Sequence, residues 1–240
     1  MLKEMVQSLV HLTGYEIMSR GRAQLAFGHR RCVAAILKEQ DINMVLDVGA
    51  NVGQFGQWIR QIGYHGHIVS FEPVADAHRK LSQVAKQDSQ WTIVPRMALG
   101  FRSGQIQIHV ARNSYSSSVL PMLASHMKAA PESGYIDCET APVNRLDDVY
   151  LPLQNERILL KIDVQGYEKA VLDGASTALR NCRAIIVEMS LVPLYEGQSL
   201  AIDLWDYLIR LGFQACDFNP EFRDPQSGRI LQMDGVFTRG

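Results

Sequence analysis

The sequence predicts an α/β fold in which a mostly parallel β-sheet has helices on both faces. Short apolar runs alternate along the chain with segments of helical spacing, as in βα repeats. The first run, residues 44–48, passes into a turn with Gly49 and Gly53 and then into a helical segment. Two further runs end in single acidic residues, Glu72 and Asp163, a pattern typical of the carboxyl edge of an open parallel sheet.

The composition indicates a globular chain with a full core and narrows the range of partners. The chain has 240 residues, 47% of them hydrophobic, which suits one large α/β domain or one domain with an added helical segment. Its formal net charge of −1 lacks the basic excess of a nucleic-acid-binding protein. The four cysteines are widely separated, so we expect reduced thiols and neither disulfides nor a zinc site. The N-terminus has no apolar stretch long enough for a signal peptide or a membrane span, so we expect a cytoplasmic protein with no nucleic-acid and no membrane partner.

Residues 1–40 predict a helical extension ahead of a main domain at 41–240. Apolar residues recur at helical spacing in residues 2–13 and again in residues 22–38. These helices could cover a ligand site, contact a second subunit in a homodimer, or pack on the edge of the sheet. We favour the last of these interpretations.

Residues 44–55 have the form of a strand, a turn and a helix that could hold a cofactor. Gly49 and Gly53 permit a positive φ and a close approach of a ligand, and the following helix directs free N–H groups at the same place. A dinucleotide would need G-x-G-x-x-G, but Ala50 and Asn51 occupy the region of its second glycine. Asp47 would repel a pyrophosphate and attract an ammonium group. S-adenosylmethionine (SAM) carries an amino group and no phosphate, so we predict SAM, with a ligand-free βα turn as the alternative.

The next two strands supply further predicted contacts with the cofactor. After a helix at 55–62, the strand at 67–71 ends in Glu72, whose two acceptor oxygens suit the hydroxyls of a ribose. A solvated glutamate at a strand end is the alternative. A helix at 75–86 and a strand at 91–94 lead to backbone groups that could contact the adenine. The complete predicted cofactor site comprises Asp47, Gly49, Ala50, Asn51, Gly53, Phe55, Glu72, Pro73, Met97, Ala98 and Asp163.

Asp163 and Glu188 are the candidates for catalysis. They end the apolar runs at 157–162 and 182–187, so they would lie on the same edge of the sheet as the glycine-containing turn. Asp163 could deprotonate a hydroxyl near the activated methyl with Glu188 assisting, or both carboxylates could bind a divalent ion. Either residue could instead cap a helix or bond a loop. No cluster of metal ligands stands out, so we predict no metal site and leave metal dependence open.

The remaining segments complete the predicted order of elements. Alternating residues at 104–112 and 136–143 predict an antiparallel insertion, and the loop at 114–131 between them would shape the acceptor pocket. The rest is expected to be a helix with residues 173–175 near its midpoint, a helix at 200–211, a strand at 213–219, a polar loop at 220–228, and one or two strands at 230–238 with a turn at 234–235.

Ordered motifs along the chain closely resemble those of FkbM-type methyltransferases. They are VLDVGANVGQF at 45–55, FEP at 71–73, ALG at 98–100, RLDD at 145–148, LKIDVQGYE at 160–168, VLDGA at 171–175 and VE at 187–188. The resemblance spans residues 44–238 and implies a Rossmann-like class I methyltransferase fold, whose seven-stranded sheet is completed by an inserted antiparallel strand. It also implies methyl transfer, usually to an oxygen of a small molecule or sugar. The family often has Glu where this chain has Gln165, which leaves Asp163 and Glu168 to carry any acid–base role.

The sequence therefore predicts a SAM-dependent O-methyltransferase that acts on a hydroxyl of a small-molecule or glycan acceptor. One alternative is a SAM-binding scaffold without catalysis, against which Asp163 and Glu188 argue. Another is an NAD-dependent oxidoreductase on a related fold, which the missing middle glycine disfavours. Nothing in the sequence identifies the acceptor.

Overall fold

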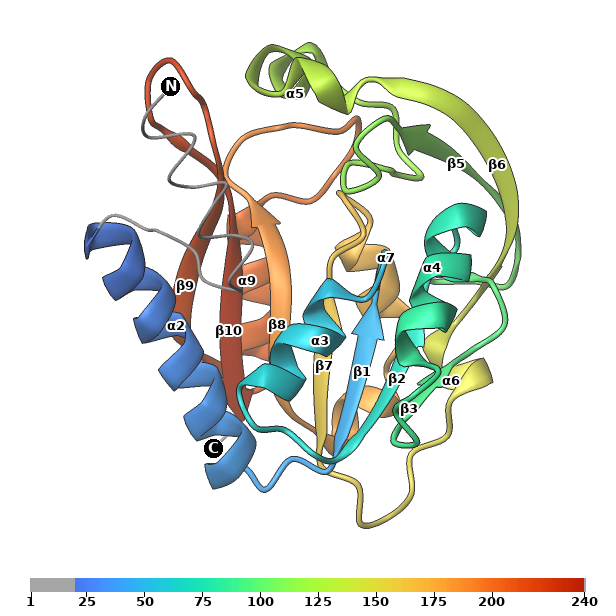
Figure 1. Cartoon of the computed structure of the whole chain (residues 1–240), viewed down its shortest axis with the longest axis vertical. Helices are drawn as coiled ribbons and strands as arrows, with labels where there is room; N and C mark the ends of the chain where they lie inside the picture. Colours follow the sequence, from blue (N-terminus) through green and yellow to red (C-terminus); the bar gives the residue numbers. More distant parts are fainter. Residues whose placement is uncertain (1–19, 240) are drawn as a thin grey trace.

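A seven-stranded sheet forms the centre of the computed structural model, which describes residues 20–239 (Figure 1). Its strand order is β3-β2-β1-β7-β8-β10-β9. The strands from β3 to β8 are parallel, and β10 runs antiparallel to both of its neighbours. The predicted sheet, with an antiparallel strand inserted near one edge, is therefore confirmed. The strands are β1 (Met44–Val48), β2 (His67–Phe71), β3 (Trp91–Ile93), β7 (Ile158–Ile162), β8 (Cys182–Ser190), β9 (Phe213–Arg223) and β10 (Ile230–Arg239).

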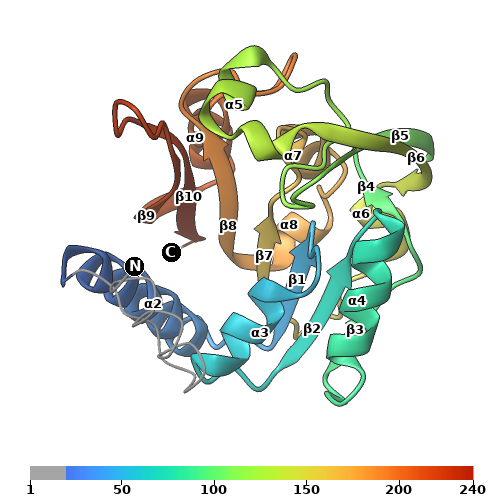
Figure 2. The same ribbon diagram turned by 45° about the horizontal axis from the view of Figure 1, so that its top comes forward.

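Helices cover both faces of this sheet (Figures 1 and 2). One face carries α2 (Arg20–Glu39), α3 (Gln54–Gln61) and α4 (Ala75–Ala85), and the other carries α7 (Glu168–Asp173), α8 (Ala178–Asn181) and α9 (Ala201–Arg210). In β1, Met44, Leu46 and Val48 pack in the core cluster that contains residues of α7, α8 and α9. Val45 packs in the cluster on the opposite face, with residues of α2, α3 and α4. Because both faces are buried, the strand is almost continuously apolar in sequence.

A second sheet of three strands lies beyond the carboxyl ends of the main strands (Figure 1). In it, β5 (Gly104–Ala111) and β6 (Tyr135–Asn144) pair antiparallel, which confirms the predicted insertion, and β4 (Ala98–Leu99) joins β6 in parallel. The segment between β5 and β6, expected to be a loop, contains α5 (Ala124–Ala129) and a 3-10 turn at Pro131–Ser133. A short helix, α6 (Leu146–Val149), follows β6.

Two predicted boundaries are wrong. The helix after Asp163 ends at Asp173 instead of having residues 173–175 near its midpoint. Gly174 is the residue that follows, and it lies against the backbone of Gly100, where an added Cβ would be 2.0 Å from the Gly100 carbonyl oxygen. The loop expected at 220–228 is also too long, because β9 continues to Arg223 and pairs with β10. Proline is tolerated at position 220 because β9 is the edge strand.

The second predicted N-terminal helix is confirmed as α2, whereas the helix expected at 2–13 lies outside the described residues. α2 packs against the edge strand β9, and His29 Nδ1 lies 2.8 Å from Asp217 Oδ2. The described part of α2 therefore packs at the edge of the sheet, as we favoured from the sequence. Within residues 20–239, no helix is both long and apolar enough to cross a bilayer.

Candidate functional site

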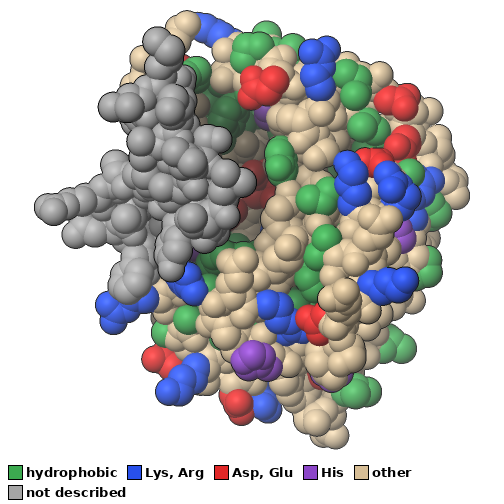
Figure 3. Space-filling model, in the orientation of Figure 1, with side chains coloured by type: hydrophobic (Ala, Val, Ile, Leu, Met, Phe, Trp, Pro, Cys, Tyr) green, Lys and Arg blue, Asp and Glu red, His purple; other side chains and the backbone are tan. Residues whose placement is uncertain are grey.

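A cavity of about 1210 Å³ opens at the carboxyl edge of the main sheet. In the orientation of Figure 1 the surface is hollowed there, and acidic side chains are visible inside the hollow (Figure 3). Most residues of the predicted site line this cavity: Gly49, Ala50, Asn51, Phe55, Glu72, Pro73, Met97, Ala98, Asp163 and Glu188. Asp47 and Gly53 do not line it. The structure therefore brings together residues that are more than a hundred positions apart in sequence.

The turn between β1 and α3 presents backbone to the cavity. The N–H groups of Gly49 and Ala50 donate to the carbonyl oxygen of Phe71 at 3.0 and 3.1 Å, which ties the turn to the end of β2. Gly49 has a φ of 77°, and an added Cβ would lie 1.8 Å from the carbonyl oxygen of Asp163. Asn51 has a φ of 47°, and its side-chain oxygen is buried without a hydrogen-bond partner. Glycine at position 49 is therefore a steric requirement of the turn.

Glu72 is fixed at the end of β2 by the same turn. Its Oε2 accepts a hydrogen bond from the Asn51 N–H and its Oε1 accepts one from the Val74 N–H, both at 2.7 Å. Burial raises the pKa of Glu72 to about 7, although these two N–H groups act in the opposite direction. Each carboxylate oxygen can accept a second hydrogen bond from a ligand in the cavity.

Asp47 lies behind the cavity wall with no exposed surface. Its Oδ2 accepts a hydrogen bond from Ser70 Oγ at 3.1 Å, and its Oδ1 has no hydrogen-bond partner but lies 3.6 Å from Lys161 Nζ. Burial raises the pKa of Asp47, against the effect of Lys161. Direct contact with a ligand ammonium, as predicted for Asp47, would therefore require the surrounding side chains to move.

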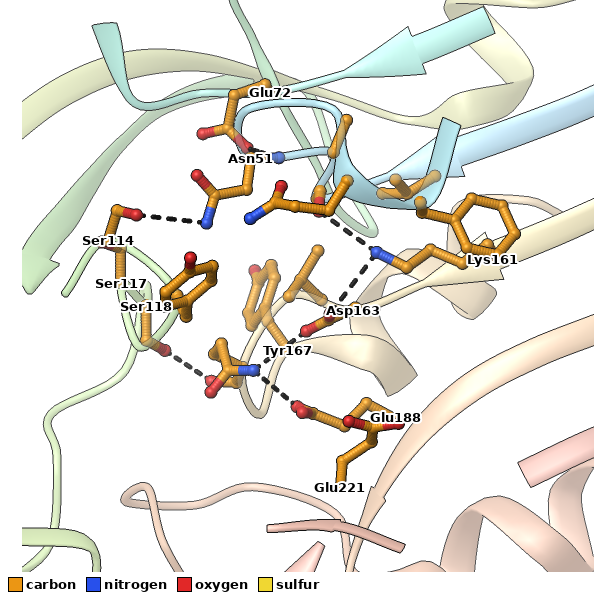
Figure 4. Close-up of a pocket in the computed structure, with 18 of the residues that line it drawn as sticks. Asn51, Glu72, Ser114, Ser117, Ser118, Lys161, Asp163, Tyr167, Glu188 and Glu221 are labelled. Atoms are coloured by element: carbon orange, nitrogen blue, oxygen red, sulfur yellow. Dashed lines mark hydrogen bonds and ion pairs between the residues drawn. The ribbon is translucent and has the colours of Figure 1, made fainter. Parts of the chain in front are cut away.

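Lys161 is the cation that sequence reasoning missed. Its Nζ lies 3.6 Å from Asp47 Oδ1 and 3.4 Å from Asp163 Oδ2, and it donates to the carbonyl oxygen of Gly49 at 3.3 Å (Figure 4). Burial alone would lower the pKa of Lys161, but the charges of Asp163 and Asp47 raise it. The sequence contained a signal for this pair, because one charged residue interrupts each of two otherwise apolar strands. The structure shows that β1 and β7 pair in a register that places Asp47 opposite Lys161.

The two catalytic candidates share one hydrogen-bond donor. Gln165 Nε2 donates to Asp163 Oδ1 at 2.9 Å and to Glu188 Oε2 at 2.8 Å. The Asp163 side chain is 34% exposed, whereas Glu188 is buried and also accepts a bond from Gln232 Nε2 at 2.9 Å. Burial and the nearby charges of Asp163 and Glu168 raise the pKa of Glu188 well above its ordinary value. Asp163 is thus the more accessible of the two carboxylates.

Glu168 serves the loop instead of the cavity. Its Oε1 accepts hydrogen bonds from the N–H groups of Val164 and Gly166 at 3.1 and 3.0 Å, and it does not line the cavity. Burial raises its pKa to about 7. The acid–base role left open for Glu168 has no geometric support.

Two further carboxylates line the cavity beside Glu188, and sequence reasoning missed them. Glu221 comes from β9 and Asp234 from β10 (Figure 4 shows Glu188 and Glu221). Asp234 pairs in register with Glu188, and burial together with Glu221 and Asp163 raises its pKa to about 7. Glu221 was placed in a loop and Asp234 in a turn, so only the pairing of β9 with β10 could have placed them here. Among the residues that the structure describes, no group of three or more His, Cys, Asp or Glu is arranged to hold a metal ion.

Comparison with known proteins identifies a family of similar sequences. The model of the methyltransferase FkbM domain matches residues 47–218. The chain is 27% identical over 180 residues to the 2-O-methyltransferase NoeI of Sinorhizobium fredii, covering 71% of this chain and 72% of NoeI. It is 27% identical over 165 residues to the hexuronic acid methyltransferase AglP of Haloferax volcanii, covering 68% of this chain and 62% of AglP. A solved SAM-dependent methyltransferase from Mesorhizobium loti is similar at a TM-score of 0.47 and 10% identity, with 82% of this chain and 90% of that chain covered.

Replacing Lys161 with Met should lower the free energy of unfolding by about 3 kcal/mol or more at pH 7.5, because it leaves the buried Asp47 carboxylate without its cation. The loss should shrink from pH 7.5 to pH 5, since the raised pKa of Asp47 favours its protonation in the folded state as the pH falls. Urea denaturation at both pH values measures this. The matched control is Lys80→Met, which removes an exposed partner of Asp76 and should leave the midpoint nearly unchanged. Equal effects of the two substitutions would contradict the assigned role of Lys161.

Proposed function

The chain belongs to the FkbM methyltransferase family, and we propose that its cavity binds SAM and directs the methyl group to a hydroxyl oxygen of a small molecule or sugar. The observation that carries the proposal is the arrangement at the ends of β1 and β2. A turn with no room for a Cβ at Gly49 lies beside a fixed carboxylate at Glu72, and both face one cavity. This combination suits a nucleoside that approaches the backbone closely and offers two hydroxyl donors.

The residues present fit SAM in three respects. Glu72 has free acceptor capacity for the ribose hydroxyls. The unpartnered side-chain oxygen of Asn51 could accept a bond from a ligand N–H or O–H group. Met97 and Ala98 provide an apolar surface for the adenine. Behind this wall, Asp47 fixes Lys161 and Ser70, and Gly53 starts α3 in a left-handed conformation with a φ of 92°. We therefore assign Asp47 and Gly53 a supporting role.

Bound SAM supplies a methyl group that its sulfonium has already activated. The remaining tasks fall to the protein: to orient the acceptor, to exclude water and to accept the hydroxyl proton. Asp163 is suited to the last task because its side chain is partly exposed to the cavity and lies 3.4 Å from Lys161 Nζ. Its Oδ1 is held by Gln165 Nε2 at 2.9 Å, so the carboxylate is fixed at the cavity wall.

The charged groups that line the cavity indicate which acceptor molecules it can bind. Its lining has the cations Lys161 and Arg223 but more carboxyl groups, those of Glu72, Asp163, Glu188, Glu221 and Asp234. Burial and the neighbouring carboxylates raise the pKa values of the last three. Carboxylate oxygens accept hydrogen bonds from hydroxyl groups and repel anions. NoeI is named as a 2-O-methyltransferase and AglP as a hexuronic acid methyltransferase. We propose that this chain takes a sugar hydroxyl, as those names suggest, and prefers an uncharged sugar to a uronic acid.

SAM binding should weaken as the pH falls through 7. Glu72 accepts best from two hydroxyls when ionised, and its pKa is about 7, so the affinity should fall about tenfold between pH 8 and pH 6. The free protein should behave oppositely: since the folded pKa lies above the ordinary value, Glu72 contributes less stability as the pH rises from about 4.5 to 7.

Calorimetric titration of SAM into wild type, Glu72→Gln and the exposed control Glu39→Gln measures the effect. We expect Glu72→Gln to bind weakly at both pH values, and NAD to give no heat with any variant. SAM affinity in Glu72→Gln equal to that of the wild type would remove Glu72 from the site.

Asp163→Asn should lower methyl transfer at least about 100-fold while leaving SAM affinity within about threefold, because the amide cannot accept the hydroxyl proton. The assay uses tritiated SAM with a panel of neutral methyl glycosides and the corresponding methyl uronide. Asp173→Asn, which changes an exposed carboxylate on α7, is the control and should retain full activity. Wild-type turnover in Asp163→Asn would reject the base assignment, and faster methylation of the uronide would reject the preference for uncharged sugars.

A further inference from the structure

Gln165 lies in the turn between β7 and α7 and has a strained backbone. Its φ is 55°, in the left-handed region that residues with a Cβ rarely adopt. The surroundings hold it there: Ser118 Oγ donates to the Gln165 carbonyl oxygen at 2.6 Å, and the next N–H, of Gly166, is bonded to Glu168. Glycine or asparagine would occupy this conformation more easily. The side chain of Gln165 must therefore supply something that these residues would not.

That side chain makes hydrogen bonds with both ends of its amide. Nε2 donates to Asp163 Oδ1 at 2.9 Å and to Glu188 Oε2 at 2.8 Å, and Oε1 accepts from the hydroxyl of Tyr195 at 2.7 Å. Both Gln165 and Tyr195 are buried. The reversed amide would place Oε1 against two carboxylates and two N–H hydrogens against the Tyr195 hydroxyl. Its orientation is therefore fixed by its neighbours.

The amide joins two carboxylates that would otherwise repel each other. The other charged groups facing this pair are Lys161, which is shared with Asp47, and the carboxylates of Glu168, Glu221 and Asp234. Gln232 supplies a second neutral donor to Glu188 only. An NH₂ group presents one N–H to each carboxylate without adding a charge, so it separates them while holding both in place. Figure 4 shows Asp163 between this contact and Lys161.

We propose that Gln165 is a positioning residue, whose amide holds Asp163 and Glu188 at a fixed separation and orients the Asp163 carboxylate toward the acceptor. This inference deepens the proposed function and rests on it for its kinetic part. Asp163 is held from two sides, by Gln165 at Oδ1 and by Lys161 at Oδ2. A neutral amide cannot take the acceptor proton, so Gln165 acts only by orienting Asp163.

Two substitutions separate this role from a structural one. Gln165→Met keeps the length of the side chain and removes its donor and acceptor. Gln165→Gly relieves the backbone and removes the whole side chain. A residue needed only for the turn would be replaced by glycine without loss of activity. The matched control is Gln83→Met, which changes an exposed side chain on α4 away from the cavity.

The first readout needs neither SAM nor acceptor. In ¹⁵N-labelled protein, the side-chain NH₂ of Gln165, assigned by its loss in Gln165→Met, should be shifted downfield and exchange slowly with water. Glu188→Gln should move this resonance, because it replaces one of the two acceptors. An NH₂ signal with the shift and fast exchange of a solvent-exposed glutamine would overturn the proposed bridge.

The second readout is kinetic, with tritiated SAM and the methyl glycoside that the wild type methylates fastest. We expect Gln165→Met and Gln165→Gly to lose at least about tenfold in kcat, with SAM affinity within about twofold of wild type. Full activity in Gln165→Gly would overturn the positioning role. If the wild-type protein does not bind SAM, the proposed function is wrong. The NH₂ resonance of Gln165 would still show whether its amide bonds Asp163 and Glu188.

Discussion

One buried cation holds the carboxyl edge of the sheet together. Lys161 on β7 lies within 3.6 Å of Asp47 on β1 and 3.4 Å of Asp163 in the following turn, and it bonds the Gly49 carbonyl oxygen. Burying the Asp47 carboxylate is costly unless a cation compensates its charge. Lys161 is that cation, and the pairing of β1 with β7 places it opposite Asp47. The β1–α3 turn also approaches the backbone of Asp163, whose N–H donates to the Val48 carbonyl oxygen at 3.1 Å.

Two halves of the site then follow from the topology. The ends of β1 and β2 present backbone and the fixed carboxylate of Glu72, which suits a nucleoside. The insertion of β10 between β8 and β9 places Asp234 and Glu221 beside Glu188, so the other half of the same cavity is acidic. We infer that the first half binds the cofactor and that the second half selects the acceptor by charge.

The sequence predicted the parts of the site that depend on local pattern. The β1–α3 turn, Glu72 and Asp163 follow apolar strands directly, so their places on one edge could be inferred from periodicity and spacing. Lys161, Gln165 and Asp234 were missed as site residues because their roles arise from pairings across 23 to 114 positions, as between Gln165 and Glu188 or between Asp47 and Lys161. The close packing of Gly174 on Gly100 is likewise a tertiary contact that no local pattern contains.

We propose that a sulfonium nucleoside lies across the ends of β1 and β2. A crystal structure of the protein with S-adenosylhomocysteine tests it most directly. We expect both ribose hydroxyls within hydrogen-bonding distance of the Glu72 carboxylate, with the adenine against Met97 and Ala98. A nucleoside bound elsewhere in the molecule, or a ribose that leaves Glu72 bonded only to Asn51 and Val74, would contradict it.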